Sequence, residues 1–365
     1  MNKNFGFIGI GLIGGSIAKT LRKVYPSCTI TVYNRSEDAR ELVMADGTAN
    51  VVCDKIDDTF KNCDYIFLCT PVEKNISFLE ELKNIIKKDC IITDVGSVKG
   101  NIHKAVKELD MEENFIGGHP MAGSEKIGYE NANDHLLENA YYAITPTDKV
   151  SEDSVTEYKE IVKDLGALPL VISPEEHDHV VATISHLPHL IASSLVNLVK
   201  DNDSEKEYMK TIAAGGFKDI TRIASSSPDM WEQICMTNGE NISEMLQKYI
   251  DSLEVVKTEI DSSDAKSIHT MFESSKNYRD NIENRTNGII SKHYILYCDI
   301  IDESGAIATI ATILATSGVN IRNIGIVHNR EFEEGVLRIS FYEKEDADNA
   351  YEQLERHRYN VIKRY

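Results

Sequence analysis

The segment from Phe5 to Ser16 restricts the fold of this chain more than any other part of the sequence. An apolar run, Phe5–Ile8, precedes Gly9, Gly11 and Gly14, and a helical pattern follows. In a strand–turn–helix unit the first glycine makes the tight turn, the second lets a pyrophosphate approach, and the third allows close helix–strand packing. A glycine-rich turn in an unrelated α/β domain is the alternative. We predict a dinucleotide-binding domain and a redox function, with cofactor contacts from Gly9, Gly11, Leu12, Ile13 and Gly14, because phosphates bind at helix N-termini.

Length and charge set the broad class. The 365 residues are enough for two or three domains. The 39 basic and 59 acidic side chains give a formal charge of −20 without a Lys/Arg block, which argues against nucleic acid or an anionic membrane as a partner. The seven cysteines form no CxxC pair, no signal peptide is recognisable, and no apolar run approaches the roughly 18 residues of a membrane span. We therefore expect a cytoplasmic protein in which local cations hold any anionic substrate.

Strand and helix patterns alternate over residues 1–172. Such alternation predicts an α/β domain of the Rossmann type, with a doubly wound parallel sheet. The apolar runs that read as strands are Phe5–Ile8, Thr29–Tyr33, Tyr65–Cys69, Ile91–Asp94, Phe115–Gly117, Tyr142–Thr145 and Pro169–Ile172.

The pattern changes at residue 173 and again near residue 292. Ser173, Pro174 and Glu176 have the spacing of a helix start with an N-cap and a capping box. We expect residues 173–286 to form an all-helical domain that covers the substrate and supplies a dimer interface. Residues 292–365 predict a ferredoxin-like β-α-β-β-α-β unit, with elements at Tyr294–Ile301, Ala306–Ser317, Val319–His328, Gly335–Tyr342, Glu345–His357 and Tyr359–Lys363.

Three segments follow strands at the sheet edge where ligands bind in doubly wound domains: Cys69–Pro71, Asp94–Lys99 and Gly117–Glu125. The third holds His119 among glycines and a proline. A histidine with its ordinary pKa near 6.5 is suited to accept a proton from an alcohol while hydride leaves the same carbon. We predict His119 as this base. A histidine that only satisfies loop backbone is the alternative.

A second group of histidines lies in the helical block, at His177, His179, His186 and His189. The first two are two residues apart and point to different helix faces, and no downstream Cys or His completes a recognised ligand set. We therefore predict no metal, and we predict that His186 or His189 contacts the substrate.

Paired glycines precede two cations one helical turn apart, Lys218 and Arg222. A guanidinium is the preferred bidentate partner of a carboxylate, so this segment predicts an anion site on a loop. An exposed i,i+4 charge pattern on a helix is the alternative. Trp231, the only tryptophan, is expected to pack in the core.

With these segments in place, the chain resembles the prephenate dehydrogenase family, in the form with a C-terminal ACT domain. The resemblance covers nearly the whole chain, through the glycine turn and the motifs DVGSVKG, GGHPMAGSEKIG, SHLPHLIA and GGFKDITRIASSSPDMW. It implies oxidative decarboxylation of prephenate to 4-hydroxyphenylpyruvate, a precursor of tyrosine. It also implies that His119 takes the hydroxyl proton, Ser97 orients that histidine and the cofactor, and Arg222 and His189 contact the substrate. Ser124 and Glu125 would lie at the pocket.

The cofactor side departs from the NAD-specific pattern. The second strand ends in Asn34-Arg35-Ser36, where NAD-specific members carry an acid for the ribose 2′-hydroxyl. A neutral Asn34 with Arg35 and Ser36 beside it favours NADP, or use of both NAD and NADP. The resemblance adds cofactor contacts from Thr70, Pro71 and Ser97.

The C-terminal unit resembles an ACT ligand module, through Asp302, Gly305 and Ala306 in one loop and Asn320 and Ile321 before the next strand. We expect L-tyrosine as an effector at this module, in a homodimer or homotetramer. A purely structural dimerisation module is the alternative.

Three other functions compete with prephenate oxidation. Arogenate dehydrogenase shares the expected fold and differs in substrate by an amino group in place of the keto group. A 3-hydroxyacid dehydrogenase fits less well, because its catalytic lysine motif has no clear match. A non-catalytic sensor of cofactor and amino acid is the third, although intact His119, Ser97 and Arg222 argue against it.

Overall fold

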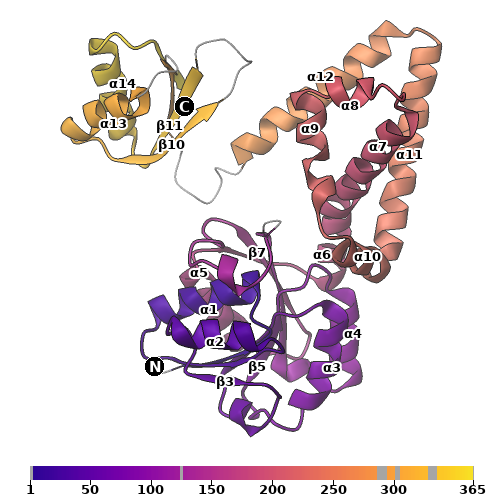
Figure 1. Ribbon diagram of the computed structural model, residues 1–365, viewed down its shortest axis with the longest axis vertical. Helices are drawn as coiled ribbons and strands as arrows, with labels where there is room; N and C mark the ends of the chain where they lie inside the picture. Colours follow the sequence, from indigo (N-terminus) through magenta and orange to yellow (C-terminus); the bar gives the residue numbers. More distant parts are fainter. Residues whose placement is uncertain (1–2, 124–125, 286–293, 301–304, 328–334, 365) are drawn as a thin grey trace. The chain divides into compact units, whose positions relative to one another are not determined.

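A computed structural model describes residues 3–123, 126–285, 294–300, 305–327 and 335–364 (Figure 1). The chain forms two compact units, Met1–Ser252 and Leu253–Tyr365. The first unit holds a sheet domain followed by helices. The second begins within a long helix and ends with a small antiparallel sheet.

The N-terminal domain is built on one eight-stranded sheet with the order β3-β2-β1-β4-β5-β6-β7-β8. All neighbouring pairs are parallel except β6 and β7, which are antiparallel, so the expectation of an all-parallel sheet holds only up to β6. The short strand β3 was not expected from the sequence. The strands are β1 (Asn4–Ile8), β2 (Thr29–Tyr33), β3 (Val51–Cys53), β4 (Tyr65–Leu68), β5 (Ile91–Asp94), β6 (Phe115–Pro120), β7 (Tyr141–Pro146) and β8 (Leu168–Val171).

Helices cover both faces of this sheet, because successive strand residues point to opposite sides. In β1, Phe5 and Phe7 join one buried cluster, whereas Ile8 joins the other. Residues of α1 (Leu12–Val24), α2 (Glu37–Ala45) and α5 (Glu152–Asp164) complete the first cluster. Residues of α3 (Val72–Leu82) and α4 (Gly100–Glu108) complete the second. The strand order reverses between β1 and β4, so a crevice is expected at the carboxyl ends of these strands.

The helical block begins as predicted, with the Ser173 hydroxyl accepting a hydrogen bond from the Glu176 N–H (3.1 Å). No strand occurs between residues 173 and 285, all of which the structure describes. A π-helical turn, Ala182–His186, joins the first two helices. The helices are α6 (Pro174–Val181), α7 (Leu187–Asn202), α8 (Tyr208–Ile212), α9 (Gly215–Thr221), α10 (Pro228–Thr237), α11 (Gly239–Asp261) and α12 (Ala265–Arg285).

The continuous helical stretch Pro174–Asn202 is long and apolar enough, by length and composition alone, to cross a membrane. The expectation that no apolar run approaches this length was therefore wrong for this segment. Its first part, however, carries His177, Asp178 and His186, which are buried in contacts with the sheet domain and with α10. Length and composition of one such helix are weak evidence for a membrane span, because helices of other proteins pass the same test.

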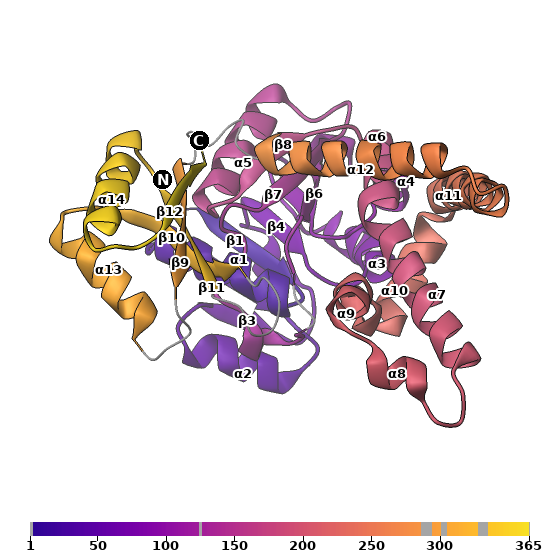
Figure 2. The ribbon, with the colours of Figure 1, turned by 90° about the horizontal axis from the view of Figure 1, so that it is seen from above.

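The C-terminal sheet has the strand order β10-β11-β9-β12, with antiparallel neighbours throughout. This order and the two helices confirm the predicted ferredoxin-like unit, seen in yellow in Figure 2. One buried cluster from both helices and the sheet forms its own core. The elements are β9 (Tyr294–Ile300), α13 (Ala306–Thr316), β10 (Ile321–Val327), β11 (Gly335–Phe341), α14 (Lys344–Arg356) and β12 (Val361–Arg364).

Buried histidines make the stability of the first unit depend on pH. Burial lowers the pKa of His103, whose ring Nε2 contacts the Thr145 hydroxyl at 2.9 Å, to about 4, and it lowers the pKa of His186 to about 4. Below about pH 6.5 the unfolded chain binds protons that the folded chain does not, so stability falls as the pH falls from about 6.5 towards 4.

We expect the thermal midpoint of unfolding to be lower at pH 5 than at pH 7. In His103→Gln this difference should shrink, because each such histidine contributes about 1.4 kcal/mol per pH unit between these limits. The glutamine amide retains a partner for Thr145 and removes the titration. Differential scanning calorimetry at the two pH values measures the change, and an undiminished difference in His103→Gln would refute it.

Candidate active site

The glycine turn has the geometry that the sequence predicts. Gly9 has a φ of +91°, and its N–H donates to the Tyr33 carbonyl at 2.8 Å. A Cβ on Gly14 would lie 2.9 Å from the Cβ of Cys69, whereas one on Gly11 would have no atom within 4 Å. Gly11 is also the N-cap of α1, with no side chain capping the helix. The turn therefore packs tightly at its first and third glycines and is open at the second, as a dinucleotide pyrophosphate requires.

The end of β2 lies against this turn. The Asn34 Oδ1 accepts a hydrogen bond from the Ile10 N–H at 3.1 Å. Arg40 donates to the backbone oxygens of Asn34 (2.6 Å) and Arg35 (3.0 Å), and the Ser36 hydroxyl caps α2. The Arg35 side chain is exposed. The three residues predicted at the ribose are thus next to the glycine turn, among positive groups and without an acid on Asn34.

A buried asparagine shapes the turn after β4. Asn75 is fully buried, and its Oδ1 accepts from the Thr70 N–H (3.3 Å) and hydroxyl (2.5 Å). Thr70 and Pro71 face a cavity of about 360 Å³ that Ser97 and residues of α10 also line. The predicted cofactor residues of this turn and Ser97 therefore share one hollow within the first unit.

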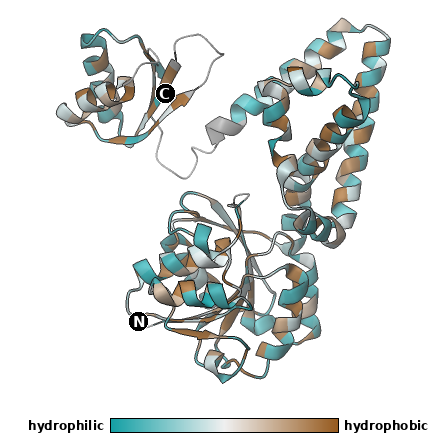
Figure 3. Cartoon of the chain, viewed as in Figure 1, coloured by the Kyte–Doolittle hydropathy of each residue, from teal (hydrophilic) through white to brown (hydrophobic). Residues whose placement is uncertain are grey.

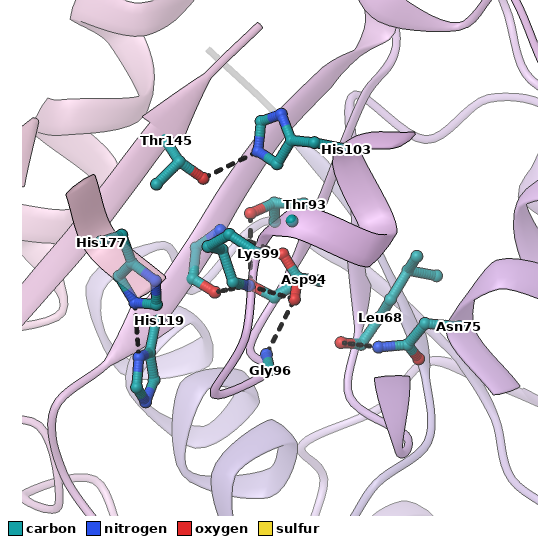
Figure 4. Close-up of polar contacts among 12 residues, drawn as sticks. Leu68, Asn75, Thr93, Asp94, Gly96, Lys99, His103, His119, Thr145 and His177 are labelled. Carbon is teal, nitrogen blue, oxygen red and sulfur yellow. Dashed lines mark hydrogen bonds and ion pairs between the residues drawn. The ribbon is translucent and has the colours of Figure 1, made fainter. Parts of the chain in front are cut away.

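A buried ion pair fixes the loop after β5. Lys99 is fully buried; its Nζ pairs with Asp94 and donates to the Gly118 carbonyl at 2.7 Å. The same carboxylate accepts from the N–H groups of Gly96 (2.9 Å) and Gly118 (3.1 Å) (Figure 4). Burial lowers the pKa of Lys99 against the pull of Asp94. The pair ties the loop that carries Ser97 to the strand that carries His119.

His119 contacts a second histidine that the sequence did not assign to the site. Its Nδ1 lies 2.9 Å from the Nε2 of His177, as Figure 4 shows. The His177 Nδ1 lies 2.8 Å from the Asp178 carboxylate, which also accepts from the N–H groups of Lys99 (2.8 Å) and Gly100 (2.7 Å). No hydrogen bond joins Ser97 to His119, both of which the structure describes. In the described structure the ring of His119 is contacted by His177, and the orientation of His119 by Ser97 stays a prediction.

The expectation of an ordinary pKa for His119 was wrong. Burial lowers its pKa well below the usual value, and the neighbouring His177, Lys99 and His186 lower it further. The ring is therefore neutral at neutral pH, which is the form that accepts a proton.

The other predicted histidines meet at the tryptophan. His186 is buried, accepts from the Asn238 amide at 3.2 Å and lies edge-on to Trp231. His189 stacks on Trp231 with ring centroids 3.8 Å apart, while its Nδ1 contacts the Ser185 carbonyl at 2.8 Å. Trp231 is only partly buried and belongs to none of the described apolar clusters, so the expectation of core packing was wrong.

The expected anion site is helical. The paired glycines open α9 instead of a loop, and Lys218 is exposed on this helix. Arg222 follows at an exposed 3-10 turn. Burial lowers the pKa of His189, and the nearby charge of Arg222 lowers it further. Ser124 and Glu125 lie outside the described residues.

The glycine turn, the open helix N-terminus and a neutral histidine at the carboxyl edge of the sheet define an NAD(P)-dependent oxidoreductase of the Rossmann type. Family profiles agree: the prephenate dehydrogenase nucleotide-binding domain matches residues 17–170, and the prephenate dehydrogenase dimerization domain matches residues 173–274. The chain belongs to the prephenate dehydrogenase family.

Individual relatives extend this match over the whole chain. A prephenate dehydrogenase of Bacillus subtilis is 38% identical over 95% of this chain and 94% of its own length. The crystal structure of prephenate dehydrogenase from A. aeolicus, in complex with hydroxyphenyl propionate and NAD+, has a TM-score of 0.73 at 31% identity, covering 77% of this chain and 99% of that one. A Synechocystis arogenate dehydrogenase has a TM-score of 0.70 at 27% identity, covering 76% and 99%.

Gly11 and Gly14 of the turn give a matched pair of variants. We expect Gly11→Ala to keep the wild-type thermal midpoint but to bind NAD(P)+ at least tenfold more weakly, because its methyl group enters the open side of the turn. Gly14→Ala should lower the midpoint, because its Cβ meets Cys69 and the Gly9 carbonyl. Calorimetric titration and scanning measure both. Undiminished cofactor affinity in Gly11→Ala would place the pyrophosphate elsewhere.

Proposed function

We propose that this chain oxidises and decarboxylates prephenate to 4-hydroxyphenylpyruvate, with hydride transfer to NAD(P)+, in the biosynthesis of tyrosine. The observation that carries the proposal is the neutral His119, partly buried at the sheet edge, with one ring nitrogen engaged by His177. Family membership supplies the substrate class, and the A. aeolicus relative was solved with NAD+ and hydroxyphenyl propionate.

Few protein groups are needed for this reaction. A nicotinamide held at the glycine turn would supply the acceptor for the hydride of the carbinol carbon. His119 accepts the hydroxyl proton, so that the carbon–oxygen bond becomes a carbonyl. The electron pair of the breaking carbon–carboxylate bond then enters the ring as CO₂ leaves, and the aromatic product recovers the proton on its oxygen. The chain's own contribution is a neutral base and correct placement.

Arg222 is proposed to hold a carboxylate of the substrate, with Lys218 as a second cation, and His189 and His186 are proposed to contact the substrate. Arg222 is exposed, and the His189 Nδ1 donates to the Ser185 carbonyl, so the Nε2 of the neutral ring is left as an acceptor for a hydroxyl or N–H group of a ligand. A guanidinium binds carboxylate bidentately. Arg222 and Lys218 supply local positive charge for an anionic substrate in a chain whose formal net charge is −20.

Both NAD+ and NADP+ are proposed as cofactors, with NADP+ preferred. Asn34 brings no negative charge to the glycine turn, while Arg35 is exposed and the capped start of α2 is adjacent. A 2′-phosphate is stabilised by a guanidinium and by a helix N-terminus. Glu37 and Asp38 in the first turn of α2 oppose this preference, which is why use of both cofactors is expected.

We expect purified enzyme to reduce NAD+ and NADP+ with prephenate, at a higher kcat/KM with NADP+. His119→Asn should lower kcat by about 10²–10⁴ through loss of the base, with cofactor affinity changed by less than a few fold. Arogenate is tested in parallel because the Synechocystis relative is an arogenate dehydrogenase. Absorbance at the reduced-nicotinamide band follows turnover.

Each outcome of this assay is informative. A higher kcat/KM with arogenate would move the assignment to that substrate. Equal activity of wild type and His119→Asn would remove His119 from the mechanism. Binding of cofactor without turnover of either substrate would favour a sensor.

The chain is proposed to form a homodimer, or a tetramer built from such dimers, in the cytoplasm. Brown, hydrophobic residues recur along the helices of the helical block in Figure 3. Five apolar residues of these helices are exposed: Ile184, Leu198, Ile212, Ile220 and Met236. Exposed apolar groups of this kind are typical of an interface, and the matching family domain is described as a dimerization domain. All seven cysteines are free thiols, which suits a reducing compartment.

The C-terminal unit is proposed to act as an ACT domain that binds L-tyrosine between two copies. Gly305, with a φ of +95°, and Ala306 start α13 after the carboxyl end of β9. Asn320 and Ile321 lie at the opposite edge, because Ile321 pairs with Phe341, which is level with the start of β9. The two segments of one copy therefore cannot meet at one small ligand. Asp302 lies outside the described residues.

We expect L-tyrosine to lower activity by a coupling of about 1–3 kcal/mol between the C-terminal unit and the active site. Removal of residues 292–365, or Asn320→Ala in the full chain, should abolish this part of the inhibition. Competition of tyrosine with prephenate at the active site would persist and is recognised by its effect on KM alone. If both variants are active and L-tyrosine inhibits them as strongly as the wild type, the C-terminal unit has a purely structural role.

A further inference from the structure

We propose that His177 and Asp178 are positioning residues of the reaction, which fix the tautomer of His119 and hold its proton-bound form. This inference rests on the proposed function of His119 as the base. It assigns a role to a pair that the sequence presented only as part of a histidine cluster.

The hydrogen positions on His119 and His177 follow from Asp178, the carboxylate at the end of this series of hydrogen bonds. Asp178 is an acceptor, so the His177 Nδ1 at 2.8 Å carries the hydrogen. The Nε2 of a neutral His177 is then an acceptor, and the His119 Nδ1 at 2.9 Å must donate to it. The hydrogen of His119 therefore sits on Nδ1, and its Nε2 keeps the lone pair that takes the substrate proton.

Asp178 is itself held on three sides. It accepts from His177 and from the backbone N–H groups of Lys99 and Gly100, at the start of α4. Asn238 donates to the backbone oxygen of Asp178 at 2.8 Å. His177 and Asp178 are both buried. A carboxylate held by this many donors cannot turn away from His177, so the tautomer is set by the fold.

His177 and Asp178 also stabilise a positive charge on His119. Burial is the main cause of the lowered pKa of His119; among the described residues, His177 on α6, Lys99 at the head of α4 and His186 on the π-helical turn lower it further, so all three disfavour a positive ring. When His119 takes the hydroxyl proton it becomes an imidazolium. The hydrogen bond through His177 connects that charge to the Asp178 carboxylate, which stabilises it without moving any atom.

The test compares His177→Gln and Asp178→Asn with His179→Gln. His179 is exposed on the same helix, two residues from His177, so the last variant is the matched control. We expect His177→Gln to lower kcat about 10- to 100-fold and Asp178→Asn about 10²- to 10⁴-fold, since an amide facing His177 reverses the donor order. KM for prephenate and the Kd of NAD+ should change less than threefold, and His179→Gln should match wild type.

A double-mutant cycle separates positioning from a merely structural role. In the His119→Asn background, His177→Gln should lower the residual kcat by less than twofold, because its target is gone. The same fold-loss in both backgrounds, or an unchanged kcat in the single variant, would overturn the proposal. If Asp178→Asn lowers the thermal midpoint, His177→Gln alone decides the result.

Nitrogen-15 chemical shifts of His119 in the full-length free protein give a readout that needs no substrate. We expect a protonated Nδ1 and an unprotonated Nε2 in wild type, and a mixture of tautomers in His177→Gln. The same mixture in wild type would overturn the proposal. A fixed tautomer in an enzyme that turns over neither prephenate nor arogenate would instead show that the proposed function had failed.

Discussion

The Asp94–Lys99 pair is the interaction on which the geometry of the site depends. An ammonium and a carboxylate without solvent contact are each expensive to bury, so neither can be removed without leaving the other uncompensated, at a cost of about 3–5 kcal/mol. Both members of the pair also bond to backbone, at Gly96 within the loop and at Gly118 on β6. The pair therefore fixes the loop between β5 and α4, and this loop supports His119.

The loop held by this pair also joins the sheet domain to the helical block. The backbone of Lys99 and Gly100 donates to Asp178 on α6, while the Lys99 side chain points into the sheet. One short segment thus positions His119 from its own strand and, through His177, from the facing helix. His119 is therefore supported both from its own strand and from the facing helix.

Local sequence signals predicted the elements but not the contacts that cross the fold. The glycine turn, the Ser173 cap and the C-terminal β-α-β-β-α-β order depend on neighbours within a few residues, and all three were predicted. The motif Asp94–Gly100 was recognised, yet nothing in its spacing says that Lys99 turns inward. His177 and His179 are two residues apart and point to different helix faces, and nothing in the sequence indicates that His177 meets His119, which lies 58 residues away in the chain. The depressed pKa of His119 follows from burial, which a sequence does not display.

The stacking of His189 on Trp231 has a practical consequence. This tryptophan is the only one in the chain, so the intrinsic indole emission of the protein comes from the contact between α7 and α10 alone. Its buried Nε1 has no partner in the described structure, and a ring in such surroundings responds to any change in polarity or contact. The molecule therefore carries an intrinsic fluorescent probe of the contact between α7 and α10, without indole emission from the other regions.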